Sequence, residues 1–249
     1  MSGKRKARLD VLLTERGLAE NRIRAAALVL AGSITVNGQV AAKPGQACAE
    51  DAVIELREKL PYVSRGGIKL AGALNHFRLQ VEGQVALDVG ASTGGFTDCL
   101  LQAGAKLVYA VDVGKGLLHW KLRQAPRVKV LEEINARYLD VALIPEPLDL
   151  ETIDVSFISL DKILPPVSRL LKPSGFILAL VKPQFEVGKG EVGKGGVVRD
   201  PEKQRAAVDR IADFARSLGL EEKGRAPAAI KGPKGNQEFF LYLRFAAQT

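Results

Sequence analysis

The chain has 249 residues, of which 47% are hydrophobic and 26% charged, and it carries a formal net charge of +8 at pH 7. This composition is that of an ordinary globular protein and excludes a disordered or collagen-like chain. No apolar stretch reaches the roughly 18 residues of a membrane span, and the basic start of the chain lacks the apolar segment of a secretion signal. We therefore expect a cytoplasmic protein without integral membrane association.

Cysteine and histidine are scarce in this sequence, with two of each. Cys48 and Cys99 are far apart and fit neither a disulfide framework nor a zinc-binding pattern. We therefore expect no metal site. The positive net charge agrees with a polyanionic partner such as a nucleic acid, although charge alone is equally compatible with a basic but otherwise ordinary enzyme.

The first 60 residues predict a small domain in which helices precede strands. Residues 8–13 carry an apolar stripe at helical spacing, and Asn21 can cap a second helix. The predicted buried face of that helix is Ile23, Ala26, Ala27 and Leu30. Asn37-Gly38 stands between β-branched runs and predicts a hairpin, because both turn residues need a positive φ. A further strand is predicted at residues 52–56.

Several of these residues together resemble the S-four-like (alpha-L) RNA-binding domain. The matching pattern is Asn21-Arg22, Ala25-Ala26, Leu30, residues 32–38 and Lys43-Pro44-Gly45. The resemblance implies binding to structured RNA, mostly through its backbone and shape. The candidate RNA-binding residues are Lys4, Arg5, Lys6, Arg8, Arg22 and Arg24, with Arg65 beyond this domain. A solvated, charged helix face is the simpler interpretation of the same charges.

A short linker at residues 61–63 leads to a second domain at residues 64–249. Apolar strands alternate there with helical patterns, the strands being expected at 85–89, 106–112, 128–131, 148–154, 176–182 and 238–245, and two of the helices at 97–102 and 201–217. Continuous apolar runs are typical of buried parallel strands, and this alternation predicts an α/β domain with an open, doubly wound, Rossmann-like sheet. Such a sheet binds its ligands beyond the carboxyl ends of the strands.

The first strand of this domain is followed by a glycine-containing loop from Gly90 to Phe96. The loop departs from the dinucleotide pattern, because Ser92 stands where a glycine would admit a pyrophosphate, and it is not a P-loop. Asp112 ends the next strand, where a carboxylate can accept hydrogen bonds from both hydroxyls of a ribose. A nucleoside without a tight pyrophosphate contact fits this combination, and we infer S-adenosylmethionine. The glycines of this loop are also explained by the backbone conformation that an ordinary turn between a strand and a helix requires.

The chemical class of the methyl acceptor can be narrowed, because each type of methyl transfer needs particular residues. Methylation of a cytosine carbon requires a reactive thiolate, and neither cysteine has a suitable context. The Asn/Asp-Pro-Pro-aromatic loop that serves exocyclic amines is missing after Asp154. A ribose hydroxyl must be steered or deprotonated, which a lysine with a lowered pKa can do. Lys182 and Asp154 both stand at strand ends, although a solvated strand end and a helix cap explain them too.

Over most of its length the chain resembles the TlyA (haemolysin-A-like) family of ribosomal RNA 2′-O-methyltransferases, whose catalytic domain is FtsJ-like. The matching motifs are residues 63–67 with Lys69-Leu70, and residues 88–98, 111–114, 135–138, 154–160, 181–186, 196–200 and 235–238. The resemblance implies that Lys182 activates the ribose hydroxyl, and that Lys69, Asp154 and Glu238 tune and position it. It also implies cofactor contacts at Gly90, Ala91, Ser92, Thr93, Gly94, Gly95, Phe96, Asp112, Ala136 and Phe157.

Three functional hypotheses follow from this sequence. The first is an rRNA 2′-O-methyltransferase that acts on a cytidine of the large ribosomal subunit, and in some members of the family also on the small subunit. The second is a non-catalytic RNA-binding or ribosome-assembly factor that keeps a cofactor fold. The third is a pore-forming haemolysin, which the absence of an apolar span disfavours.

Overall fold

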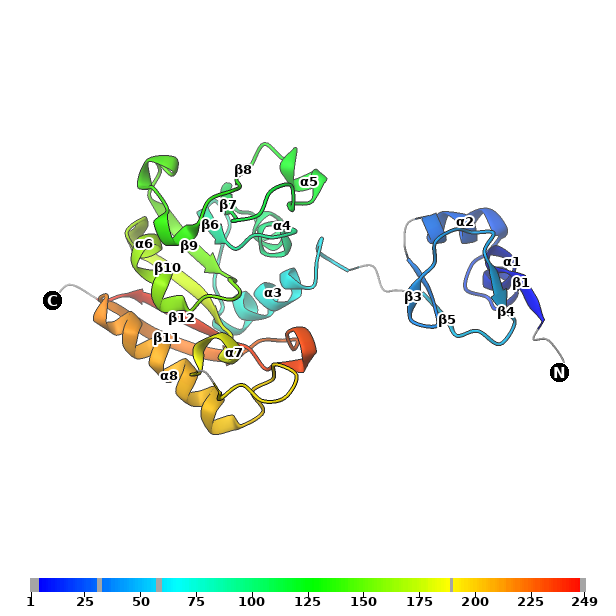
Figure 1. Ribbon diagram of the computed structural model, residues 1–249. Helices are drawn as coiled ribbons and strands as arrows, with labels where there is room; N and C mark the ends of the chain where they lie inside the picture. Colours follow the sequence, from blue (N-terminus) through cyan, green and yellow to red (C-terminus); the bar gives the residue numbers. More distant parts are fainter. Residues whose placement is uncertain (1–4, 31–32, 57–59, 189, 247–249) are drawn as a thin grey trace. The chain divides into compact units, whose positions relative to one another are not determined.

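The computed structural model describes residues 5–30, 33–56, 60–188 and 190–246. The chain forms two compact units, Met1–Leu60 and Pro61–Thr249 (Figure 1). Within the described parts of both units, no helix combines the length and apolar character that crossing a membrane requires.

The described residues of the first unit form two helices and five short strands. Its elements are β1 (Lys6–Arg8), α1 (Leu9–Glu15), α2 (Arg22–Leu30), β2 (Ile34–Val36), β3 (Gln39–Val40), β4 (Ala47–Ala49) and β5 (Ile54–Leu56). β1 pairs with β4, and β2 lies between β3 and β5 in a three-stranded sheet. Asn37 and Gly38 have φ angles of 50° and 79° and join β2 to β3. The predicted hairpin is therefore confirmed.

Helix α2 begins as the sequence predicts but buries a different face. The Arg24 N–H donates to Asn21 Oδ1 at 2.9 Å, so Asn21 caps the helix. The buried residues are Ala25 and Val29, whereas Ile23 and Leu30 are 85% and 76% exposed. The predicted face was wrong because apolar residues surround this short helix, and only packing against the core side chains of α1 selects the buried stripe.

The second unit is built on a seven-stranded sheet in the order β11-β12-β10-β9-β6-β7-β8. The strands are β6 (Val85–Val89), β7 (Leu107–Val111), β8 (Val128–Leu131), β9 (Leu148–Ile153), β10 (Leu171–Val181), β11 (Leu220–Pro227) and β12 (Phe239–Phe245). β6 to β10 run parallel, and β12 is antiparallel to both β10 and β11. The Rossmann-like fold is confirmed. β11 was not predicted, because its exposed polar residues interrupt any apolar run.

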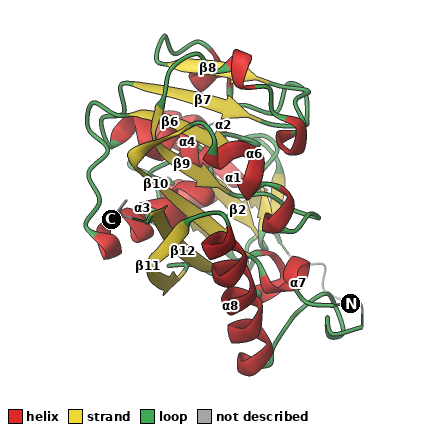
Figure 2. Ribbon diagram, turned by 90° about the vertical axis from the view of Figure 1, so that its left-hand side faces the viewer, coloured by secondary structure: helices red, strands yellow, loops and turns green. Residues whose placement is uncertain are grey.

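Helices cover both faces of this sheet (Figure 2). α3 (Gly66–Phe77), α4 (Gly95–Gln102) and α5 (Trp120–Arg123) contribute to one core, and α6 (Leu164–Ser168) and α8 (Pro201–Ser217) to the other. The predicted bounds of α8 are confirmed: Asp200 caps it by accepting from the Glu202 N–H at 2.9 Å, and Ile211 is fully buried. Burying such a side chain contributes about 1.5–3 kcal/mol.

The strand order reverses at β6. The chain runs from β6 through β7 to β8 on one side, then crosses to β9 and β10 on the other. The crevice beyond the carboxyl ends of β6 and β9 is therefore the topological switch point, where open α/β sheets bind ligands. Gly90, Asp112, Asp154 and Lys182 each follow directly after one of these strands.

Candidate active site

Lys182 is held between two acceptors from the loop that follows β9. Its Nζ lies 2.6 Å from Asp154 Oδ1 and donates to Ser156 Oγ at 2.9 Å. The Asp154 N–H donates to Val89 O at 2.9 Å, which continues the pairing of β9 with β6 and fixes the start of the loop. Two adjacent parallel strands thus bring a lysine and a carboxylate into contact.

A second lysine–carboxylate pair joins α3 to the start of β12. Lys69 Nζ donates to Glu238 Oε2 at 2.6 Å, and the Glu238 side chain is fully buried. Removing one partner of such a buried pair is strongly destabilising, because the other charge is left without compensation. The other carboxylate oxygen packs against Gly232, where an added Cβ would come within 2.0 Å of Glu238 Oε1.

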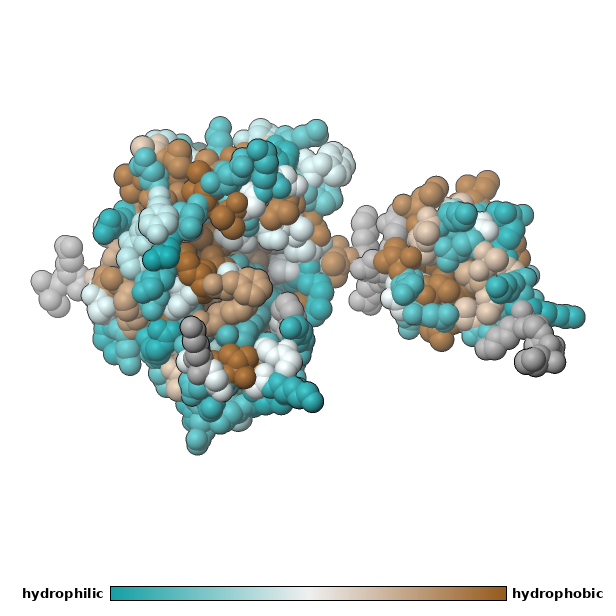
Figure 3. Space-filling model, in the orientation of Figure 1, coloured by the Kyte–Doolittle hydropathy of each residue, from teal (hydrophilic) through white to brown (hydrophobic). Residues whose placement is uncertain are grey.

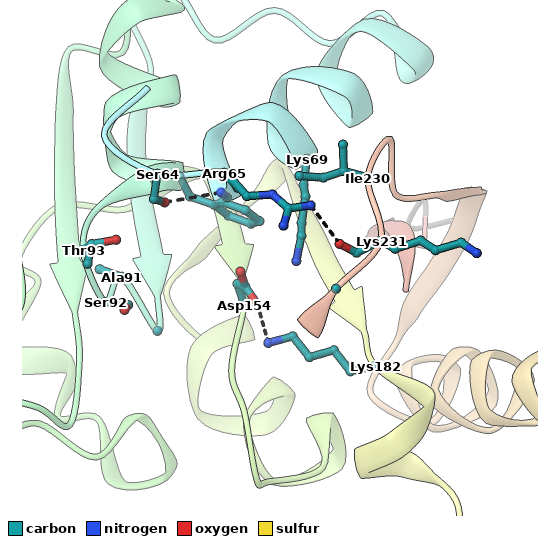
Figure 4. Close-up of a pocket in the computed structure, with 15 residues that line it drawn as sticks. Ser64, Arg65, Lys69, Ala91, Ser92, Thr93, Asp154, Lys182, Ile230 and Lys231 are labelled. Carbon is teal, nitrogen blue, oxygen red and sulfur yellow. Dashed lines mark hydrogen bonds and ion pairs between the residues drawn. The ribbon is translucent and has the colours of Figure 1, made fainter. Parts of the chain in front are cut away.

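Both pairs open onto adjoining cavities. Lys69, Asp154 and Lys182 line one cavity of about 420 Å³, which we call the lysine cavity. Figure 4 shows these three side chains pointing into it from three different elements. Glu238 lines a neighbouring cavity of about 360 Å³ together with Lys182, Phe157 and other residues, which we call the aromatic cavity. The fold therefore brings together all four predicted catalytic residues.

The glycine loop and Asp112 border a further cavity of about 500 Å³, the Asp112 cavity. Asp112 Oδ2 accepts from the Ser92 N–H and Oδ1 from the Gly114 N–H, each at 2.7 Å. Each carboxylate oxygen keeps a second lone pair for a hydroxyl donor. Gly90 has a φ of 83°, and a Cβ there would lie 2.5 Å from Asp154 O. Only glycine permits this close approach of the two strand ends.

The predicted cofactor residues divide between these cavities. Ala91, Thr93, Gly95 and Phe96 line the lysine cavity; Asp112, Ala136 and Phe157 line the Asp112 cavity; Gly90 and Ser92 line both. Gly94 lines neither: with a φ of 93° it precedes α4 and packs against Leu118 and Leu122. Because the cavities adjoin and share Gly90, Ser92 and Asp154, the residues present fit a nucleoside whose ribose lies at Asp112 and whose tail reaches the lysine cavity.

An exposed phenylalanine stands where the Asp112 and aromatic cavities meet. Phe157 is 90% exposed, has a φ of 63°, and its ring centroid lies 5.0 Å from that of Phe185. A positive φ is strained for a bulky residue and occurs mostly at functional sites. Figure 3 shows hydrophobic and hydrophilic residues interleaved around a hollow on this face of the second unit.

A carboxylate that sequence reasoning missed holds the far end of the loop that follows β9. Glu186, in α7 (Pro183–Glu186), accepts from Ser159 Oγ at 2.6 Å and from the Leu160 N–H at 2.9 Å, and it also pairs with Arg210. Burial raises the pKa of Glu186, and these partners oppose the rise. The loop from Asp154 to Leu160 is thus anchored by Lys182 at one end and by Glu186 at the other. The motifs at residues 154–160 and 181–186 contain both sides of this contact, but neither motif indicates that Glu186 meets the loop.

The candidate RNA-binding residues lie at the surface wherever the structure describes them. Arg5, Lys6, Arg8, Arg22 and Arg24 are exposed in the first unit, and Lys4 lies outside the described residues. Arg65 is exposed in the second unit and donates to Lys231 O at 3.5 Å beside the lysine cavity. Among the described residues, no group of three or more His, Cys, Asp or Glu side chains is placed to hold a metal ion.

Known proteins share both units. The family model of FtsJ-like methyltransferases matches residues 62–245, and the S4 domain model matches residues 7–54. The 16S/23S rRNA (cytidine-2′-O)-methyltransferase TlyA of Mycobacterium tuberculosis is 46% identical over 242 residues, which cover 96% of this chain and 90% of the relative. Hemolysin A of Brachyspira hyodysenteriae is 39% identical over 237 residues, with 95% and 99% covered.

A solved structure from Streptococcus thermophilus, named a hemolysin, has 44% sequence identity and a TM-score of 0.76, and the match covers 99% of this chain and 90% of that one. Hemolysin names thus occur among relatives that share this methyltransferase architecture. The resemblance drawn from the sequence motifs is confirmed. The chain belongs to the TlyA family of FtsJ-like methyltransferases, and it carries an S4 domain before the methyltransferase domain.

Proposed function

We propose that this protein transfers a methyl group from S-adenosylmethionine to the 2′-oxygen of a cytidine ribose in ribosomal RNA, in the large subunit and also in the small one. The observation that carries the proposal is the convergence of two lysine–carboxylate pairs beside a nucleoside-sized cavity. The name of the M. tuberculosis relative supports the choice of rRNA, cytidine and 2′-oxygen. We expect the reaction to take place in the cytoplasm, with the ribosomes.

Asp112 and the glycine loop would hold the cofactor. The two carboxylate oxygens of Asp112 face a cavity and can accept from the ribose hydroxyls. Gly90 and Ser92 border both adjoining cavities and would contact the bound nucleoside. When bound, S-adenosylmethionine supplies an electrophilic methyl group.

Lys182 would direct the attacking oxygen. Asp154 Oδ1, at 2.6 Å from Nζ, and Ser156 Oγ, which accepts from Nζ at 2.9 Å, fix the direction of the Lys182 side chain. Lys182 lines the lysine cavity, where the ribose would enter. The proton of the ribose 2′-hydroxyl would pass to Lys182 Nζ as the oxygen bonds to the methyl carbon and the bond between that carbon and the sulfur of the cofactor breaks. General-base assistance of this kind contributes about 10²–10⁴-fold to the rate.

Lys69 would act through its charge. Its ammonium group projects into the lysine cavity, where it stabilises the negative charge that develops on the 2′-oxygen. Glu238 fixes the position of this ammonium group in a buried environment, because Oε2 accepts its hydrogen bond at 2.6 Å. The two pairs therefore have different tasks: one takes up the proton and the other stabilises charge.

RNA would be held by both domains, which we place at residues 1–60 and 64–249 with a linker at 61–63. In the first domain, Lys4, Arg5, Lys6, Arg8, Arg22 and Arg24 would contact RNA phosphates. In the second, the exposed Arg65 beside the lysine cavity would hold the backbone near the target ribose. Such contacts would position the RNA relative to the catalytic residues.

The decisive experiment measures methyl transfer from labelled S-adenosylmethionine to ribosomal subunits that lack the modification. Wild type is compared with Lys182→Ala and with Lys129→Ala, an exposed lysine of β8 that serves as the control. We expect label in a 2′-O-methylcytidine, its loss in Lys182→Ala and its retention in the control. A folded, cofactor-binding wild type that labels neither subunit would favour a non-catalytic assembly factor instead.

A further inference from the structure

A buried carboxylate in the first unit joins two of the arginines that we propose bind RNA. Asp10 lies in the first turn of α1, and its side chain is 7% exposed. Its Oδ1 accepts from Arg8 Nε at 3.0 Å, and its Oδ2 accepts from Arg8 Nη2 at 2.9 Å and from Arg22 Nη2 at 3.0 Å. The hydrogen bonds from Arg8, together with the charge and hydrogen bond of Arg22, hold the pKa of Asp10 well below its usual range.

Both arginines remain open to solvent despite these bonds. Their side chains are 56% exposed for Arg8 and 59% for Arg22. A guanidinium carries more N–H donors than the bonds to Asp10 use. Arg8 ends β1 and Arg22 begins α2, so a single carboxylate aligns cations from two separate elements. Adjacent, oriented guanidinium groups match the oxygens of a phosphodiester.

The neighbouring turn leaves room for this arrangement. The Asp10 N–H donates to Pro44 O and the Leu9 N–H to Gln46 O, each at 3.0 Å, so the start of α1 is docked on residues 43–46. The Arg8 guanidinium lies against Gly45, where an added Cβ would come within 3.0 Å of both Nη1 and Nη2. A side chain at this position would displace the group that Asp10 holds.

We infer that Asp10 is a positioning residue for RNA binding, which aligns Arg8 and Arg22 so that both contact RNA phosphate groups. This inference rests on the proposed function, in which these arginines bind RNA. Electrostatics alone predicts the opposite effect, because a carboxylate repels RNA and its removal should tighten binding. The geometry predicts weaker binding, since a released arginine must lose rotamer freedom again each time it contacts a phosphate.

Two variants of the full chain separate geometry from charge. Asp10→Asn removes one negative charge, and Gly45→Ala changes no charge but displaces Arg8. Glu20→Gln is the matched control, because Glu20 is exposed in the same unit and the charge change equals that of Asp10→Asn. Affinity is measured with isolated large ribosomal subunits and with a labelled RNA hairpin over a range of salt concentrations, and circular-dichroism melts show that each variant is folded.

We expect Asp10→Asn to bind RNA about fivefold more weakly and Gly45→Ala about twofold more weakly, with binding by Glu20→Gln unchanged or tighter. The dependence of log Kd on log salt should fall in slope by about 0.7–0.9 for each phosphate that the variant no longer neutralises, a change that a purely structural defect does not produce. If Asp10→Asn does not fold, the RNA affinity of Gly45→Ala alone tests the inference. Binding by Gly45→Ala that equals that of wild type refutes it. RNA binding that tightens in Asp10→Asn as in Glu20→Gln also overturns it. A wild type that binds no RNA overturns the proposed substrate as well.

Discussion

Lys69 Nζ and Glu238 Oε2 lie 2.6 Å apart although 169 positions separate the two residues in the chain. Helix α3 and the start of β12 meet only in the folded protein, and the pair they form is removed from solvent. Breaking one partner of a buried pair is costly, whereas replacing both by apolar residues is often neutral. Single and double substitutions can therefore distinguish the contribution of this pair to stability from its contribution to catalysis.

Single and double substitutions of this pair should therefore differ. We expect Glu238→Ala to lower the free energy of unfolding by about 3–5 kcal/mol, because Lys69 is left buried without its partner. The double variant Lys69→Met with Glu238→Leu should recover most of that stability but remain inactive in methyl transfer. Urea denaturation and the labelling assay measure the two properties. A double variant that regains activity would contradict the catalytic role of both residues.

Gly232 should be intolerant of any side chain because of its contact with Glu238. A Cβ at this position would lie 2.0 Å from Glu238 Oε1, so Gly232→Ala must displace the carboxylate and weaken its bond to Lys69. We expect kcat to fall about tenfold or more, at a stability cost of about 1–3 kcal/mol. Gly188→Ala, whose nearest neighbour is the carboxylate of Glu191, should behave like wild type. Equal activity of the two variants would be inconsistent with this account.

Ser156 should matter for the rate and little for binding. Its hydroxyl accepts from Lys182 Nζ at 2.9 Å, so Ser156→Ala removes one of the two acceptors that direct the lysine. We expect kcat to fall about tenfold while KM for RNA and cofactor stays within about twofold. Ser156→Thr keeps the hydroxyl and should restore most of the rate. Steady-state kinetics on ribosomal subunits test this, and an unchanged kcat in Ser156→Ala would refute it.

Glu186 does not line the Asp112 cavity, but it should stabilise the loop after β9 that does. Glu186→Gln presents an amide donor where Ser159 Oγ and the Leu160 N–H now donate to a carboxylate, so the loop that carries Phe157 loses an anchor. We expect the free energy of unfolding to fall by about 1–3 kcal/mol. Affinity for S-adenosylmethionine, measured calorimetrically, should fall with it, because Phe157 and Ser156 line the Asp112 cavity. Asp213→Asn, an exposed control on α8, should change neither property.

Asp88 should make the folded state less stable as pH rises. Burial raises the pKa of this carboxyl from 3.8 to about 7, against the opposing hydrogen bond from Thr97. Asp88 ionises near pH 4 in the unfolded chain and only near pH 7 in the folded chain. The contribution of its neutral carboxyl to the free energy of unfolding is therefore complete below about pH 4 and is lost between about pH 4 and pH 7. The loss amounts to as much as ~4 kcal/mol.

Thr97 and Thr152 both donate to the Asp88 carboxyl. Asp88→Asn keeps an acceptor for one of these hydroxyls and presents an N–H to the other, which can rotate to accept it, much as a protonated carboxyl would. We expect the variant to be as stable as wild type near pH 4 and more stable above about pH 7. Urea denaturation across this range tests the expectation. A difference between the proteins that does not grow with pH would show that Asp88 is ionised in the folded state as well.

Local sequence patterns predict several elements of the fold. Strands β6 and β8 and helix α8 appear with their expected bounds, because buried apolar runs and a capped amphipathic helix are local properties of the chain. The hairpin at Asn37-Gly38 follows from the φ angles that its turn requires. The polar edge strand β11 and the buried face of α2 escaped prediction, because neighbouring elements decide both.

The sequence by itself determined the order of the apolar strands in the second unit, the glycine turn after β6 and the residue types available for chemistry, since these depend on local periodicity and backbone preference. Only the tertiary structure decided which of those residues meet. Lys182 contacts Asp154 because β9 and β10 are neighbouring parallel strands, and Lys69 reaches Glu238 because α3 packs over the same sheet. Contacts between distant segments arise from packing around a shared core, which no local pattern encodes.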